Sequence, residues 1–176
     1  MMIEKIMTGA GILLVHFLNR SPYLDLSDKL PFHFQPDLMF IFVIFFSLRR
    51  GALTGLWVGF FGGLLTDLDQ GAVDSTAVIH SMIGLHTFSY SIIGYLMGKF
   101  GRNAYNENFL SISITMFVLT LLVRGVTFTL YIFFFKADEK NYAFFGTAFF
   151  NSILSPIFFS ALSWIYRMES AEVSNE

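Results

Sequence analysis

The sequence is poor in cysteine and in charge. It contains no cysteine, which excludes disulfide bonds, thiolate metal ligands and a cysteine nucleophile. Charged residues make up 14% of its 176 residues, well below the roughly 25% of soluble domains. The net charge of −2 offers no basic surface for nucleic acid. HExxH, GxSxG and Walker-loop motifs are also missing, so the sequence predicts a protein that is not an enzyme and carries no cofactor or metal.

Apolar side chains are abundant instead. Hydrophobic residues account for 55% of the chain, and it contains 23 phenylalanines. A domain of this length could not bury so much apolar surface in water, which indicates an integral membrane protein surrounded by lipid. The apolar segments cover residues 6–18, 38–48, 52–66, 76–97, 109–135 and 142–166. The last three are long enough to cross a bilayer, which takes about 20 helical residues.

The apolar run from residue 38 to residue 66 is interrupted only by the letters RRG at 49–51. As one straight helix, this run would place Arg49 and Arg50 in the middle of the bilayer, at a cost of several kcal/mol. A tight turn at Gly51 brings both side chains to a membrane surface instead. We therefore predict an all-α bundle of six transmembrane helices. Five helices are the alternative, with residues 38–48 as a partial or re-entrant helix.

Lysine and arginine in the predicted loops set the orientation, because these residues are enriched on the cytoplasmic side. The more basic side holds Lys5, Arg49, Arg50, Lys99, Arg102 and Arg167. Both termini are therefore predicted to be cytoplasmic. No small-residue cleavage site follows the first apolar segment, which is interpreted as a retained helix. We expect residues 1–168 to form one membrane domain and residues 169–176 a disordered cytoplasmic tail.

Glycine recurs at every fourth position in the stretch GALTGLWVGFFGG. The glycines with this spacing are Gly51, Gly55, Gly59 and Gly63, and a second pair follows at Gly94 and Gly98. A glycine in a helix costs about 1 kcal/mol relative to alanine in water, so a row of them needs a reason. In membranes, small residues at this spacing let two helix backbones approach closely. We expect them to pack helices of this chain, with an interface to a different protein as the alternative.

Two charged residues lie in or beside apolar segments. Arg124 is near the middle of residues 109–135, where a charge is costly and is usually paired or functional. Asp67 follows the glycine row. We interpret Arg124 as a member of a structural pair, with Asp67 as the candidate partner. The alternatives are that the Arg124 side chain snorkels to one membrane surface, or that it faces a cavity or a partner protein.

Several short motifs follow one another in the middle of the chain. They are Pro36, Asp37 and Leu38 opening an apolar segment, Leu48 and Arg49 before Gly51, the spaced glycines, Asp67 before Gly71, Gly84 with His86, and Gly94 with Tyr95. In this order the motifs resemble those of the MreD family, the bacterial rod shape-determining membrane proteins. The outer apolar segments are similar to that family only in hydropathy.

The resemblance implies a multi-pass protein of the bacterial inner (cytoplasmic) membrane. Such a protein belongs to the cell-elongation machinery, where it helps organise lateral peptidoglycan synthesis and maintain cell shape. The implied partners are membrane lipids and an MreC-like protein, and through it MreB, RodA and a class B penicillin-binding transpeptidase. The candidate functional residues are Pro36, Asp37, Arg49, Arg50, Asp67, His86 and Arg124.

The resemblance also implies a fold similar to the six-helix substrate-binding subunits of energy-coupling-factor transporters. The alternative function is therefore the substrate-binding membrane subunit of a small-molecule, vitamin-type transporter. In that case Arg124 and Asp67 would line the ligand pocket.

Overall fold

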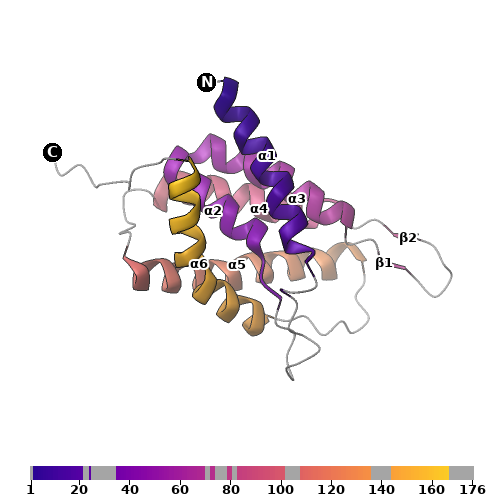
Figure 1. The fold of residues 1–176 in the computed structure, drawn as a ribbon. Coiled ribbons are helices and arrows are strands. Elements are labelled where there is room, and N and C mark those ends of the chain that lie inside the picture. The colour runs from indigo at the N-terminus through magenta and orange to yellow at the C-terminus, as the bar shows by residue number, and fades with distance from the viewer. Residues whose placement is uncertain are drawn as a thin grey trace.

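The computed structural model describes residues 2–21, 24, 35–69, 72–73, 79–80, 83–101, 108–135 and 144–166 (Figure 1). The helices are α1 (Met2–Asn19), α2 (Leu38–Arg50), α3 (Ala52–Asp69), α4 (Leu85–Leu96), the π-helix η1 (Met97–Gly101), α5 (Phe109–Phe135) and α6 (Phe144–Tyr166). Two strands of two residues each, β1 (Ala72–Val73) and β2 (Ile79–His80), pair antiparallel. Apart from this pair the described elements are helical, as predicted. The expected tail at 169–176 lies outside the described residues.

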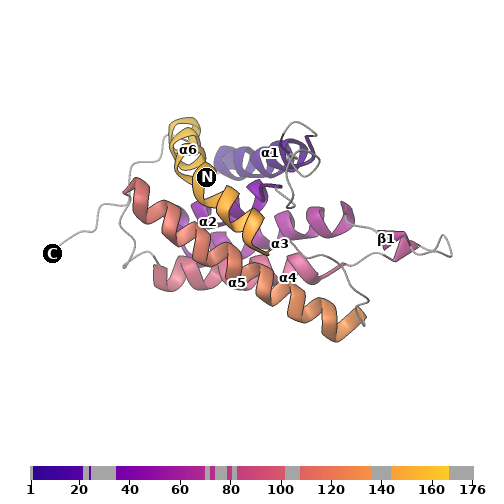
Figure 2. The same cartoon turned by 90° about the horizontal axis from the view of Figure 1, so that it is seen from below.

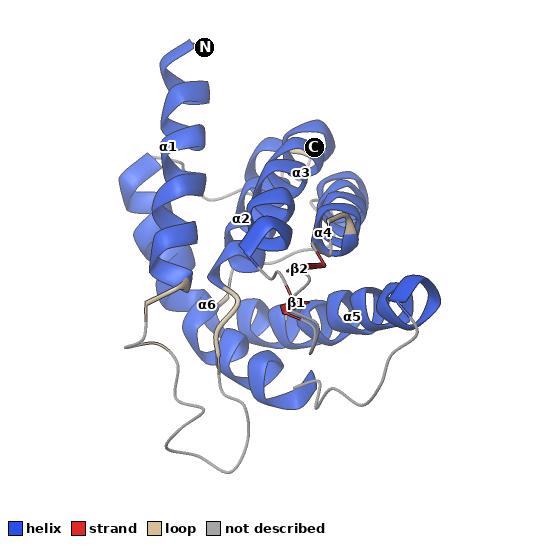
Figure 3. Cartoon of the chain, turned by 90° about the vertical axis from the view of Figure 1, so that its right-hand side faces the viewer, coloured by secondary structure: helices blue, strands red, loops and turns tan. Residues whose placement is uncertain are grey.

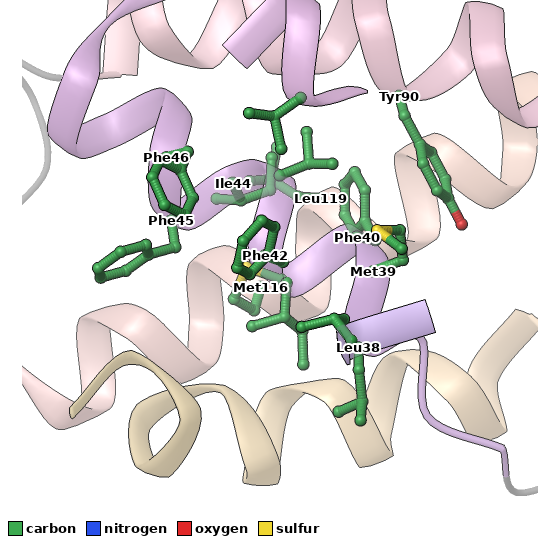
Figure 4. Packing of buried hydrophobic residues seen from close by; sticks show 14 of the residues in the cluster. Leu38, Met39, Phe40, Phe42, Ile44, Phe45, Phe46, Tyr90, Met116 and Leu119 are labelled. Atoms are coloured by element: carbon green, nitrogen blue, oxygen red, sulfur yellow. The ribbon is translucent and has the colours of Figure 1, made fainter. Parts of the chain in front are cut away.

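Helix α2 lies at the centre of the fold. Every residue from Leu38 to Leu48 is buried, and α1, α3, α4, α6 and η1 all contact this helix. Figure 4 shows its side chains interleaved with Tyr90 of α4 and with Met116 and Leu119 of α5. At 1.5 Å per residue α2 is about 20 Å long, shorter than the roughly 30 Å hydrocarbon core of a bilayer. Because every residue from Leu38 to Leu48 is buried, the apolar surface of this short helix is covered by protein and not by lipid.

The predicted turn between residues 38–48 and 52–66 is confirmed. Helix α2 ends at Arg50, α3 begins at Ala52, and Gly51 between them has a φ of 89°. This left-handed conformation is one that glycine adopts without strain. The guanidinium of Arg49 donates a hydrogen bond to the Ser163 hydroxyl of α6 at 3.1 Å, so this end of α2 is also tied to α6.

The predicted helix over residues 76–97 is wrong at both ends. Helix α4 begins only at Leu85, residues 79–80 belong to β2, and the helix continues past residue 97 as η1. Residues 76–84 are apolar enough to resemble a helix, but Gly84 takes a left-handed φ of 113° that an α-helix cannot contain. The start of α4 is instead fixed by contacts with the end of α3, described below.

Helices α3 and α4 lie side by side with their backbones in direct contact (Figure 3). A Cβ atom added at Gly55 would lie 2.5 Å from the carbonyl oxygen of Gly94, and one at Gly59 would lie 2.5 Å from that of Tyr90. One added at Gly63 would lie 2.5 Å from the Cα of Thr87. At the other end of the contact, a Cβ on Gly98 would meet the backbone of Gly51 and Ala52. Both sets of spaced glycines therefore face each other within this chain.

Helices α5 and α6 pack along each other (Figure 2) and are the two described helices that are long and apolar enough to cross a membrane. Their outer faces are apolar: Phe133 of α5 is 82% exposed and Trp164 of α6 is 83% exposed. Their buried positions include polar side chains instead, such as Thr120, Thr127 and Asn151. Apolar side chains outside and polar ones inside are the pattern expected of helices that face lipid.

Candidate functional site

Asp37 caps the N-terminus of α2 from a buried position. One carboxylate oxygen accepts a hydrogen bond from the Phe40 amide at 3.0 Å, and the other accepts one from the Tyr90 hydroxyl at 2.6 Å. The Asp37 amide itself donates to the side-chain oxygen of Asn151 at 2.8 Å. The first turn of a helix leaves unpaired amides, so these side chains supply partners that water supplies in a soluble protein.

The same end of α2 is joined to the remaining helices. Asn151 of α6 donates through its side-chain amide to the Thr120 hydroxyl of α5 at 3.1 Å. Asn19, at the end of α1, accepts a hydrogen bond from the Leu38 amide at 2.9 Å. Asp37, Tyr90, Asn151 and Thr120, here called the Asp37 cluster, therefore connect α2, α4, α6 and α5, and Asn19 adds α1.

Asp67 performs a similar task for α4, although it belongs to the last turn of α3. Its carboxylate accepts hydrogen bonds from the amides of Gly84, His86 and Thr87 and from the Thr87 hydroxyl, at 2.7 to 2.9 Å. It also lies 2.9 Å from Nδ1 of His86. The α4 N-terminus is thus capped by a side chain from another helix, which explains why α4 starts at Leu85.

His86 links the two aspartates. The Asp67 carboxylate can only accept a hydrogen bond, so Nδ1 of His86 is the donor and carries a proton. The other ring nitrogen, Nε2, takes no part in this contact. The His86 ring meets the Tyr90 ring edge to face, with their centroids 5.4 Å apart. Tyr90 in turn donates to Asp37. A continuous line of contacts therefore runs from the end of α3 through α4 to the start of α2.

A polar cavity of about 280 Å³ adjoins these contacts. Its lining includes Pro36, Asp37, His86, Tyr90 and Arg124, together with Arg20 and Asp69. Arg20, directly after α1, and Asp69 of α3 form an ion pair at 2.6 Å, in which the Arg20 side chain is largely exposed. The cavity thus lies between the ends of α1 and α3, the start of α2, and the helices α4 and α5.

The structure brings five of the predicted site residues together and separates two others. Pro36, Asp37, His86 and Arg124 all line the polar cavity, and Asp67 contacts His86. Arg49 and Arg50 lie at the opposite end of α2. The interpretation that Asp67 pairs with Arg124 stays a prediction; the hydrogen bonds described for Asp67 all come from the start of α4.

Tyr90 and Asn19 contribute to the site but were not among the candidates. Tyr90 is 53 residues from Asp37, so no local spacing connects them. A tyrosine inside an apolar segment is ordinary, and only the buried position reveals that its hydroxyl needs a partner. Asn19 gave a weak signal as a polar residue closing an apolar segment.

Replacing Tyr90 with phenylalanine tests the Asp37 cluster. The substitution removes the hydroxyl that donates to Asp37 and leaves a buried carboxylate oxygen without this bond. We expect a loss of about 1–3 kcal/mol in the free energy of unfolding. Thermal unfolding of the purified protein measures it. Tyr95→Phe on the same helix, at a half-buried position outside the cluster, is the control and should change stability little. Equal losses in the two variants would contradict the assignment.

The fold and the site together define a helical bundle with apolar side chains outside and buried polar side chains joining the helix ends, a pattern consistent with a membrane protein. Residues 13–168 match the family model described as rod shape-determining protein MreD. The match covers most of the chain, which therefore belongs to the MreD family and is a cell-shape-determining membrane protein. Comparisons with curated proteins and with solved structures give no match.

Proposed function

We propose that this protein is a non-enzymatic component of the bacterial cell-elongation machinery and helps organise lateral peptidoglycan synthesis. The observation that carries the proposal is the family match over residues 13–168. The site supports a structural role, because the Asp37 and Asp67 carboxylates hold helix ends through hydrogen bonds. In this role Pro36, Asp37, Asp67, His86 and Arg124 keep the bundle in one arrangement for its partners.

The proposed arrangement has all six α-helices within the inner membrane and both termini in the cytoplasm. Arg49 and Arg50 then lie at the cytoplasmic end of α2, where basic residues are favoured. Asp37 and the polar cavity lie toward the opposite side. Helix α2 is too short to span on its own, but the helices around it shield it from lipid.

The proposed partner is an MreC-like protein, and through it MreB, RodA and a class B transpeptidase. We assign the contact to the outer face of α3, because its inner face is occupied by α4. Trp57, Phe60 and Phe61 form an exposed aromatic group there, with the Trp57 and Phe61 rings stacked at a centroid distance of 6.0 Å. Rigid aromatic side chains are frequent anchors of protein interfaces.

Photo-crosslinking in living cells tests this assignment, and the two tryptophans of the chain make a matched pair. Both are exposed, Trp57 on α3 and Trp164 on α6. With a photoreactive amino acid at each position in turn, we expect an adduct with the MreC-like protein from position 57 and none from 164. An adduct from 164 alone would move the contact to α6.

Two further results would contradict the proposed function itself. One is a normal rod shape in cells that lack the protein. The other is recovery of transporter ATPase subunits and a coupling protein, instead of cell-wall synthesis proteins, when the tagged chain is isolated in mild detergent. The second result would favour the transporter alternative.

A further inference from the structure

The polar cavity is lined by charged side chains of both signs. Arg20 and Asp69, at 2.6 Å, form an ion pair at its edge. Asp37 is buried and Arg124 is half-buried, and both line the same space. Arg124 comes from α5, one of the two helices that meet the length and composition of a membrane span. Ionisable residues inside membrane helices commonly mark a binding or transport path.

The lining of the cavity includes groups that can bind a positive charge and groups that can bind a negative charge. The Asp37 carboxylate accepts one hydrogen bond at each oxygen, from Phe40 and Tyr90, and the remaining lone pair of each oxygen can accept from an ammonium group. Arg124 supplies a guanidinium, which binds phosphate and carboxylate through paired donors. His86 has Nδ1 directed to Asp67, and its ring lines the cavity. Tyr90 and Asn19 add further polar atoms to the lining.

We infer that this cavity binds a small zwitterion, a group that carries an ammonium together with a phosphate or a carboxylate. The ammonium lies toward Asp37 and the anionic group toward Arg124. The volume of about 280 Å³ suits a lipid headgroup or a molecule the size of an amino acid. The inference is independent of the proposed partner contact, which lies on the outer face of α3.

Two sources offer this chemistry. One is a membrane lipid with an ethanolamine headgroup, which would enter from the bilayer. The other is a soluble zwitterion that would enter from the aqueous side. The headgroup and the soluble molecule share the same pair of charges, so the experiment has one arm for each.

Thermal unfolding of the purified full-length chain in detergent tests the site with defined probes. The lipid arm compares phosphatidylethanolamine with phosphatidylglycerol, which has no ammonium, and with phosphatidylcholine, whose quaternary ammonium donates no hydrogen bond. The soluble arm compares O-phosphoethanolamine and glycine with inorganic phosphate. We expect the ammonium-bearing probe of at least one arm to raise the unfolding temperature by about 5 °C at saturation. Its matched probes should give less than half of that shift.

Variants connect the shift to the cavity. Arg124→Gln should abolish the shift, whereas Arg50→Gln, at the opposite end of α2, should retain it. Equal shifts for phosphatidylglycerol and phosphatidylethanolamine would overturn the zwitterion site in favour of an anion site. No shift with any probe, or the same shift in Arg124→Gln as in the unaltered chain, would also overturn it. If Arg124→Gln does not fold, the probe comparison on the unaltered chain decides alone. None of these results bears on the crosslinking of Trp57.

Discussion

Replacing Gly59 with valine should reduce the free energy of unfolding by more than about 3 kcal/mol. The first added atom, Cβ, would lie 2.5 Å from the carbonyl oxygen of Tyr90 and 2.6 Å from its carbonyl carbon. Both atoms belong to the backbone of α4 and cannot rotate away as a side chain can. Helices α3 and α4 would have to separate, and the line from Asp67 to Asp37 would be disturbed with them.

Gly125→Val is the matched control for this prediction. Gly125 also lies inside a helix, but a Cβ added there meets nothing within 4 Å. The change in helix propensity is the same at both sites, so the difference between the variants isolates the helix contact. Thermal unfolding in one detergent measures both. Similar stabilities would show that α3 and α4 do not approach this closely.

The α3–α4 contact illustrates what the sequence could predict. Glycines four residues apart have a function in a membrane helix only if another backbone comes close, so their spacing alone indicated a packed face. The turn at Gly51 was predictable for an equally local reason, since two adjacent arginines interrupt an apolar run. The glycine row and the turn were both predictable because the residues that cause each feature are close together in the sequence.

Features that depend on distant residues could not be predicted in the same way. The start of α4 is set by Asp67, which is 17 to 20 residues from the amides that it caps. Without that contact, the apolar stretch before Gly84 resembles the beginning of a helix. The burial of α2 was equally hidden, because a segment covered by lipid and one covered by other helices have the same apolar composition.

The contacts of Asp67 were hidden in the sequence for a related reason. Asp67 and Arg124 are opposite charges in apolar surroundings, so an ion pair was the simplest expectation. A helix N-terminus offers a carboxylate several amide donors and a favourable dipole at once. Three amides and a hydroxyl at the start of α4 donate hydrogen bonds to Asp67. Arg124 lines the polar cavity.

Asp67→Asn should cost about 2–4 kcal/mol in the free energy of unfolding, although it changes the shape of the side chain very little. One carboxylate oxygen accepts from the Gly84 and Thr87 amides, and the other accepts from the His86 amide and ring. An asparagine has one oxygen, and its NH₂ group cannot accept. In either orientation of the side chain, the asparagine NH₂ group takes the place of one carboxylate oxygen. This group is itself a donor, so the donors at the start of α4 that this oxygen served lose their acceptor.

Asp69→Asn, in the same turn of α3, provides the control. Asp69 pairs with the largely exposed Arg20, and pairs of this kind contribute about 1 kcal/mol or less. Thermal unfolding compares the two variants, and hydrogen exchange at the Gly84, His86 and Thr87 amides locates the effect. Faster exchange there in Asp67→Asn, with little change in Asp69→Asn, is the expected result. Equal losses in both variants would mean that α4 is held by its glycine contact with α3 and not by the Asp67 carboxylate.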